Sequence, residues 1–346
     1  MTTLHRRGAS LLTFCIPTYN RVGSVVPLVR RVLECDSDEI EIVVADNCST
    51  DDTLAQLESI GDPRLVVLRN TVNRGALFNQ VNVLLQGSGI YSALLLDKDS
   101  VDPAILPAFL DFLRRESPST GYCEYHQPVG SPVRRFQQGA DALKGMAYSC
   151  HHPSGYFFRK ADLHDIRIVE RFSEHAVVGN FPFEFMQAEL AMRGPAAIFQ
   201  EPVFVPESLA GAKAVKSFTI NAMKEDAFFS PKGRLNTAVR FSAHIYSLPL
   251  PRETQKQLVF DRFAQGLWLS TVGYRSVMAN EAICEHYHIA PRRVSRLELI
   301  SIATTYLRDF VAQLKSLRQG VDHPDSGDLL LDTVRRLVRR VGRGIT

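Results

Sequence analysis

Two aspartates separated by a single residue, Asp97 and Asp99, are the strongest chemical signal in the sequence. They directly follow the apolar run 93–96, which is typical of a buried strand. Two carboxylates at positions i and i+2, where a strand turns into a loop, can share one hard divalent cation that keeps open positions for phosphate oxygens. The alternative is an ordinary strand-to-helix turn in which Asp99 or Ser100 caps the helix.

Three further segments accompany this aspartate pair in a fixed order. They are FCIPTYNR at 14–21, VVADNCSTDDT at 43–53 and NRG at 73–75. One short motif occurs easily by chance, whereas four motifs in order, each at the end of an expected strand, do not. Together these segments resemble the family 2 glycosyltransferases of the GT-A fold, over roughly residues 11–110.

The resemblance implies roles for the residues that contact the nucleotide of a sugar donor. Pro17, Thr18 and Tyr19 correspond to the segment on which the base lies, and a tyrosine face suits base stacking. Asp46 resembles the aspartate that accepts a hydrogen bond from a ring N–H of the base, which suits uracil, thymine or guanine better than adenine. Arg74 is similar in position to residues that face the diphosphate; the alternative is an exposed arginine at a helix entry.

The aspartate pair receives its roles from the same resemblance. Asp97 resembles the residue near the ribose and the metal, Asp99 resembles the direct metal ligand, and Lys98 lies between them in the nucleotide-sugar site. The implied cofactor is a divalent metal, Mn²⁺ or Mg²⁺. Such an ion neutralises the charge that develops on a departing diphosphate.

An inverting transferase also needs a carboxylate that takes the proton from the acceptor hydroxyl. In the family this residue opens a helix in the second half of the domain, and the matching stretch here is 181–194. Glu184 is the first candidate because neighbouring phenylalanines would raise its pKa by desolvation, and Glu189 is the second. The acidic pair that is usual in the family is absent, and Glu184 is alternatively a helix N-terminal carboxylate that complements the helix dipole.

A histidine-containing segment precedes another expected strand. The resemblance implies that this neighbourhood lines the acceptor pocket, so His151, His152 and Ser154 are predicted to bind the acceptor. Adjacent residues of an extended segment point to opposite faces, so both histidines are not expected to bind one metal ion. The alternative is a pair of loop histidines without a functional role.

The elements that position these residues alternate between strands and helices in the first half of the chain. Strands are expected at 11–16, 39–45, 64–68 and 91–96, which predicts an open, mostly parallel α/β sheet whose ligands lie at the carboxyl ends of its strands. We expect a GT-A domain over residues 1–210, a Rossmann-like sheet sandwiched by helices. A mainly helical region is expected over 211–346, with helices at 234–246, 254–273 and 297–317, and it could contribute to oligomer formation.

Composition excludes several other classes of protein. Hydrophobic residues make up 45% of the chain, charged residues 22%, and the net charge is +3, so no global field favours nucleic acid as a partner. Six cysteines without paired spacing argue against a zinc site and a disulfide framework. The sequence shows no signal-peptide run and no apolar window of the ~20 residues that span a bilayer, so a cytoplasmic location is expected.

The segment 329–343 combines apolar residues at helical spacing with five arginines. A basic amphipathic helix of this kind can lie on an anionic membrane surface, which predicts a peripheral position at the inner face of the cell membrane. The alternative is a terminal helix that packs on the protein and leaves its basic face in solvent.

These observations predict an inverting glycosyltransferase. The donor would be a nucleotide-diphosphate sugar, and the acceptor a hydroxyl of a glycan or lipid-linked molecule in cell-surface polysaccharide synthesis, such as an O-antigen or capsule. The alternative is a catalytically silent GT-A module that binds a nucleotide-sugar or glycan as an assembly subunit. A nucleotidyltransferase is disfavoured because no glycine-rich, lysine-bearing phosphate loop follows the first strand.

Overall fold

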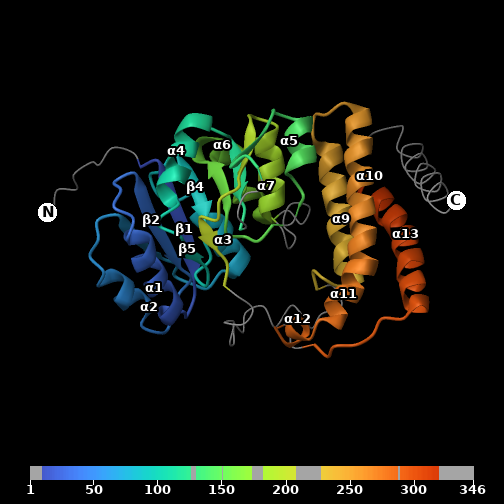
Figure 1. The fold of residues 1–346 in the computed structure, drawn as a ribbon, viewed down its shortest axis with the longest axis horizontal. Coiled ribbons are helices and arrows are strands. Elements are labelled where there is room, and N and C mark those ends of the chain that lie inside the picture. Colours follow the sequence, from blue (N-terminus) through green and yellow to red (C-terminus); the bar gives the residue numbers. More distant parts are fainter. Residues whose placement is uncertain are drawn as a thin grey trace. The chain divides into compact units, whose positions relative to one another are not determined.

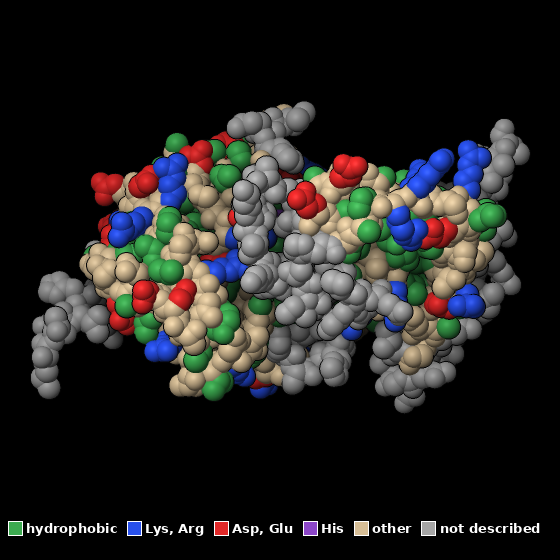
Figure 2. Space-filling view, turned by 90° about the horizontal axis from the view of Figure 1, so that it is seen from below, with side chains coloured by type: hydrophobic (Ala, Val, Ile, Leu, Met, Phe, Trp, Pro, Cys, Tyr) green, Lys and Arg blue, Asp and Glu red, His purple; other side chains and the backbone are tan. Residues whose placement is uncertain are grey.

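The computed structural model describes residues 10–125, 130–149, 151–173, 182–207, 227–286 and 289–318. The chain divides into two compact units, Met1–Glu207 and Ser208–Thr346. The first is an α/β unit built on a sheet, and the second consists of helices (Figure 1). Among the coloured side chains of Figure 2, acidic and basic groups are interspersed over the visible face, as the small net charge leads one to expect.

The first unit is organised around an eight-stranded sheet with the strand order β3-β2-β1-β4-β8-β6-β9-β7. Strands β1 to β4 are parallel neighbours, while β7 and β8 run against the rest. The predicted mostly parallel sheet is therefore confirmed. The strands are β1 (Leu12–Thr18), β2 (Ile40–Asp46), β3 (Leu65–Arg69), β4 (Tyr91–Leu94), β6 (Thr120–Cys123), β7 (Val133–Phe136), β8 (Tyr156–Arg159) and β9 (Ala196–Phe199).

Helices flank this sheet and bury its central strands. Every residue of β1 is buried, as expected for a parallel strand that is covered on both faces. The helices of this unit are α1 (Val22–Leu33), α2 (Thr53–Glu58), α3 (Ala76–Val83), α4 (Leu106–Glu116), α5 (Ala140–Gly145), α6 (Lys160–Asp165), the 3₁₀ turn η1 (Glu170–Ser173) and α7 (Pro182–Ala191). Phe181, the expected start of α7, lies outside the described residues.

An aromatic cluster fixes the part of the sheet beneath the predicted site. Phe109 of α4 packs against Phe157 of β8 at 5.5 Å and Phe199 of β9 at 5.3 Å between ring centroids. Its ring is also 6.2 Å from that of Phe204, which in turn packs on Phe14 of β1. Through these contacts, the segment that follows β9 is packed against the centre of the sheet.

A small second sheet brings this later segment past the end of β4. It pairs β5 (Ser100–Val101) with β10 (Phe204–Val205) in antiparallel fashion. Because β5 begins directly after Asp99, this pairing carries Glu207 next to the aspartate pair. The backbone N–H of Glu207 donates to Asp99 Oδ1 at 3.0 Å.

The second unit confirms the predicted helical C-terminal region. Its helices are α9 (Pro231–Ser247), α10 (Arg252–Trp268), the π-helical turn η2 (Leu269–Gly273), α11 (Tyr274–Ala279), α12 (Glu281–His286) and α13 (Arg296–Arg318). Ser230 caps α9 by accepting from the N–H of Gly233 at 3.0 Å. Gly266 allows α10 to approach α13, because a Cβ at this position would lie 2.1 Å from the Tyr306 hydroxyl.

None of the helices in the described part of the chain is both long and apolar enough to cross a membrane. The segment 329–343, predicted as a basic amphipathic helix, lies outside the described residues.

Replacing Phe109 by alanine tests the importance of the aromatic cluster. We expect Phe109→Ala to lower the free energy of unfolding by about 3–5 kcal/mol, because the lost ring leaves a cavity among buried aromatic side chains. Denaturant unfolding followed by circular dichroism measures the change. Val72→Ala, at a position 60% exposed, is the control and should change the value by less than about 0.5 kcal/mol. A loss below about 1 kcal/mol in Phe109→Ala would contradict this interpretation of the core.

Candidate active site

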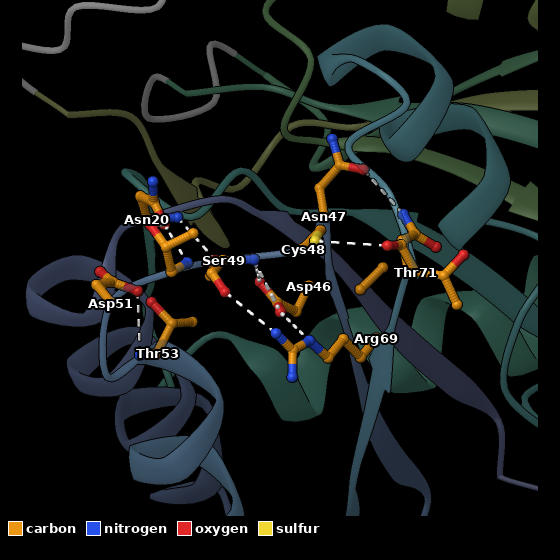
Figure 3. Close-up of polar contacts among 12 residues, drawn as sticks. Asn20, Asp46, Asn47, Cys48, Ser49, Asp51, Thr53, Arg69 and Thr71 are labelled. Carbon is orange, nitrogen blue, oxygen red and sulfur yellow. Dashed lines mark hydrogen bonds and ion pairs between the residues drawn. The ribbon is translucent and has the colours of Figure 1, made fainter.

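The loops that follow β1 and β2 are tied together at the carboxyl edge of the sheet (Figure 3). The hydroxyl of Ser49 accepts from the N–H of Asn20 at 2.8 Å, and the Asn20 side-chain oxygen accepts from the N–H of Thr50 at 2.7 Å. Asn20 has a φ of 51°, a conformation that asparagine tolerates better than most residues. These contacts leave Tyr19 41% exposed, so its ring face is open to a ligand. Pro17 and Thr18, the last two residues of β1, are buried.

Asp46 ends β2 and shapes the loop behind it. Both of its carboxylate oxygens accept from the N–H of Ser49 at 3.2 Å, and its Oδ2 lies 3.8 Å from Nε of Arg69 (Figure 3). The side chain of Asp46 is fully buried, while that of Arg69 is half exposed. Contact of Asp46 with a base therefore stays a prediction, since its carboxylate is closed to solvent and already paired with Arg69.

Sequence analysis missed Arg69. It ends β3 and pairs in register with Asp46 of β2. The signal was an arginine at the end of a strand that lies beside the aspartate-bearing strand, and it becomes visible only when the strand register is known.

A network of asparagine side chains holds the loop that carries Arg74. Asn47 Oδ1 accepts from the N–H of Arg74 at 3.1 Å and from Asn70 Nδ2 at 2.9 Å, and Asn47 Nδ2 donates to Asn73 Oδ1 at 2.8 Å. The Arg74 guanidinium carbon lies 3.5 Å above the centre of the Phe78 ring. The network places a cation at the entrance of α3, on the same edge of the sheet as Tyr19.

Asp97 is bonded to the last residue of β1 and to Arg21, which directly precedes α1. Its Oδ2 accepts from the Thr18 hydroxyl at 2.9 Å, and its Oδ1 accepts from Arg21 Nη1 at 3.0 Å. Burial raises the pKa of Asp97, although the positive charge of Arg21 and the bond from Thr18 oppose this rise. Lys98, between the two aspartates, is partly exposed.

Asp99 lies deeper than Asp97, and its side chain is fully buried. His152 Nε2 is 2.6 Å from Asp99 Oδ2, the Ser154 hydroxyl donates to the same oxygen, and the N–H of Glu207 donates to Oδ1. Burial raises the pKa of Asp99, but the interactions with His152, Ser154 and Glu207 outweigh this effect and lower the pKa overall. Asp99 is therefore held as an oriented carboxylate.

We name residues 151–154 the histidine segment. Its two histidine side chains point in different directions, as expected for neighbours on an extended chain. The His151 ring stacks on Tyr122 at 3.9 Å, whereas His152 is directed to Asp99. Burial lowers the pKa of His151 to about 4. The side chain of His152 remains 27% exposed, so it is the histidine that a ligand can reach.

Glu184, the first candidate for the base, is fully buried under the histidine segment. Its carboxylate accepts from the N–H of Ser149 at 3.0 Å, from the N–H of His151 at 3.2 Å, and from the Tyr156 hydroxyl. In this conformation it positions the histidine segment. Its role as a base stays a prediction that requires the covering segment to move.

Glu189, the second candidate, points to another part of the unit. Its Oε2 pairs with Arg171 Nη1 of η1 at 2.8 Å, and its side chain is 17% exposed. An arginine partner stabilises the charged form of a carboxylate and so weakens it as a base. The structure thus brings Asp97, Asp99, His152 and Ser154 together, while Glu189 has a separate ion pair.

The side chains around Asp99 fit a divalent ion that completes its coordination with ligand oxygens. Within the described ranges, no three His, Cys, Asp or Glu side chains converge as a complete metal site. Ions that serve phosphate substrates often take only one or two protein ligands and fill their other positions with phosphate and water. Asp99 offers carboxylate oxygens at such a place, beside the partly exposed His152.

Residues 13–164 match the family model described as glycosyl transferase family 2. This segment contains the ends of β1, β2 and β4 and the histidine segment. This part of the chain is therefore similar to glycosyl transferase family 2.

Relatives with curated names act, by those names, in polysaccharide biosynthesis. The chain is 29% identical over 102 residues to the colanic acid biosynthesis glycosyl transferase WcaA of Escherichia coli (strain K12), which covers 29% of this chain and 37% of that protein. It is 30% identical over 152 residues to the teichuronic acid biosynthesis glycosyltransferase TuaG of Bacillus subtilis (strain 168), covering 40% of this chain and 60% of that protein. The chain thus spans less than two thirds of each relative.

The crystal structure of S. aureus TarS 1-349 is similar over nearly the whole chain. The TM-score is 0.55 at 15% identity, with 90% of this chain and 92% of that chain covered. This likeness shows the fold, which is GT-A followed by a helical region.

The buried His151 generates a prediction about pH. Its pKa of about 4 in the folded state lies below the ordinary value of 6.5, so the unfolded chain takes up the proton first as the pH falls. The contribution of neutral His151 to the free energy of unfolding is fully present above about pH 6.5. It is lost progressively between about pH 6.5 and pH 4, by about 1–2 kcal/mol for a partly exposed ring.

His151→Phe keeps a ring against Tyr122 and removes the titrating group. Denaturant unfolding at several pH values should give a smaller loss in this variant than in the unchanged chain between about pH 6.5 and pH 4. His164→Ala, at an exposed position, is the control and should keep the full loss. Equal losses in all three proteins would contradict the proposed burial of a neutral His151.

Proposed function

We propose that this protein is an inverting glycosyltransferase that moves a sugar from a nucleotide-diphosphate donor to a hydroxyl of a glycan or lipid-linked acceptor. One observation carries the proposal: Tyr19, Asp46, Asp97 and Asp99 all end or follow parallel strands at one edge of the sheet, where ligands of such sheets bind. The family of residues 13–164 supports the reaction class. The names of the relatives support a role in cell-surface polysaccharide synthesis.

The donor nucleotide would lie across the loops after β1 and β2. Tyr19 offers an exposed ring face for the base, and Pro17 and Thr18 form the floor beneath it. Asp46 would accept from a ring N–H once Arg69 moves aside, which favours uracil, thymine or guanine. Arg74 would face the diphosphate from the entrance of α3, with Lys98 as a further donor-site cation.

A divalent metal, Mn²⁺ or Mg²⁺, would be held by Asp99, with Asp97 alongside. When bound, such an ion neutralises negative charge on the leaving diphosphate. Asp97 already has Arg21 and Thr18 as partners, so its part is to orient this loop and approach the ribose. Ser154 and the N–H of Glu207 keep the Asp99 carboxylate oriented before any ligand arrives.

The acceptor would approach over the histidine segment, along His151, His152 and Ser154. Inversion requires a carboxylate that takes the acceptor proton on the sugar face opposite the diphosphate. Glu184 would serve if the segment above it moves on binding, and Glu189 is the second candidate. A position at the inner face of the cell membrane, with 329–343 on the lipid surface, would suit a lipid-linked acceptor, and the helical unit could support an oligomer.

The buried position of Glu184 favours one alternative. A GT-A module that binds a nucleotide-sugar or glycan without turnover, as an assembly subunit, needs no reachable base. Binding without transfer or donor hydrolysis would distinguish this alternative from the enzyme.

A ligand panel tests the donor site. UDP-, GDP-, dTDP- and CMP-sugars should be compared in a thermal-shift assay with and without Mn²⁺, because a ligand of the native state raises the melting temperature with its occupancy. We expect at least one of the first three to stabilise the unchanged chain only with Mn²⁺. Asp99→Ala should abolish this shift and donor turnover. The proposal is wrong if the variant keeps both, or if no donor shifts the unchanged chain.

Glu184→Gln separates a base from a positioning group. The glutamine amide is a weaker hydrogen-bond acceptor than the Glu184 carboxylate, which accepts from three donors. If Glu184 only positions the histidine segment, the free energy of unfolding should therefore fall by about 1–3 kcal/mol. If Glu184 is also the base, transfer should fall about 100-fold or more with donor binding kept. Glu189→Gln is the matched variant on the same helix. A Glu184→Gln protein with unchanged stability and unchanged transfer would exclude both roles.

A further inference from the structure

An imidazole is among the partners of the buried Asp99 carboxylate. His152 Nε2 lies 2.6 Å from Asp99 Oδ2, whereas Asp97 directs its oxygens to Thr18 and Arg21. We propose that His152 is a direct ligand of the divalent ion together with Asp99, and that this nitrogen ligand favours Mn²⁺ over Mg²⁺. The inference rests on the proposed function, because the ion is the one that serves the donor diphosphate.

The position of His152 is fixed from several sides, as a metal ligand requires. Its backbone carbonyl accepts from the Tyr125 hydroxyl at 3.1 Å, and the His152 and Tyr125 rings are arranged edge to face with centroids 5.7 Å apart. The N–H groups of Ser149 and His151 donate to the buried Glu184. Outer contacts of this kind orient a ligand and raise the affinity of a metal site.

Asp99 is oriented in the same way. Its Oδ1 accepts from the N–H of Glu207 at 3.0 Å, and the Ser154 hydroxyl donates to Oδ2. The carboxylate is closed to solvent, but His152 is 27% exposed. The exposed side of the pair is thus the route by which an ion and the phosphate oxygens can arrive. An ion bound to both residues would replace the hydrogen bond between them.

The mixed pair of ligands has a consequence for the choice of metal. Mg²⁺ prefers oxygen ligands in a rigid octahedral arrangement, whereas imidazole nitrogen suits first-row transition ions. One carboxylate and one imidazole therefore shift the preference from Mg²⁺ toward Mn²⁺. Two carboxylates at the same place would restore the preference for Mg²⁺.

Paramagnetic resonance of Mn²⁺ tests this assignment without measuring activity. The full chain is titrated with Mn²⁺ in the presence of UDP, and in parallel GDP, and pulsed spectra are examined for hyperfine coupling to an imidazole nitrogen. We expect the coupling in the unchanged chain and its loss in His152→Ala, with Mn²⁺ affinity reduced about 10-fold or more. His152→Asp should bind Mg²⁺ better, relative to Mn²⁺, than the unchanged chain does.

His151→Phe is the matched control, because it alters the adjacent histidine and leaves His152 in place. It should keep the nitrogen coupling. The measurement on the unchanged chain does not depend on the folding of any variant. If its bound Mn²⁺ shows no nitrogen coupling, the inference is wrong. If the nucleotide still binds in that case, the proposed function stands. Coupling that persists in His152→Ala also overturns it. If neither nucleotide binds with or without Mn²⁺, the proposed donor site and this inference both fail.

Discussion

The arrangement of the candidate site depends on the burial of Asp99 at the end of β4. A carboxylate closed to solvent is stable only when its charge is met by hydrogen bonds or a cation. Here His152, Ser154 and the N–H of Glu207 provide them. These partners come from two separate parts of the chain, the histidine segment and the residues directly after β10, and both meet Asp99 at the edge of the sheet.

The same requirement links the core to the site. The Phe204 ring packs on Phe14 and Phe109, which anchors β10 and directs the chain toward Glu207. Below the histidine segment, Glu184 accepts from the backbone N–H groups of Ser149 and His151 and so holds the chain next to His152. Apolar packing thus sets the path of the chain, and buried hydrogen bonds set the direction of individual side chains.

The sequence predicted the features that depend on local pattern. Strand and helix periodicity identified the mostly parallel sheet and the helical second region, and strand ends singled out Asp97 and Asp99 as candidates for the site. What it missed depends on contacts distant in sequence. Arg69 lies beside Asp46 only through the register of β2 and β3, and the asparagine network around Asn47 requires the loops after β2 and β3 to meet. Likewise, neighbouring phenylalanines predicted a raised pKa for Glu184, but the backbone N–H groups of Ser149 and His151 that donate to it come from more than thirty residues away in the sequence.

The central claim is that the edge of the sheet at Asp99 binds the diphosphate of a sugar donor through a divalent ion. A crystal structure of the protein with UDP or GDP and Mn²⁺ tests it most directly. The account predicts anomalous density for Mn²⁺ in contact with Asp99 and with the phosphate oxygens, and a base stacked on Tyr19. A nucleotide bound with the Asp99 side chain still closed against His152, and no ion between the protein and the diphosphate, would contradict it.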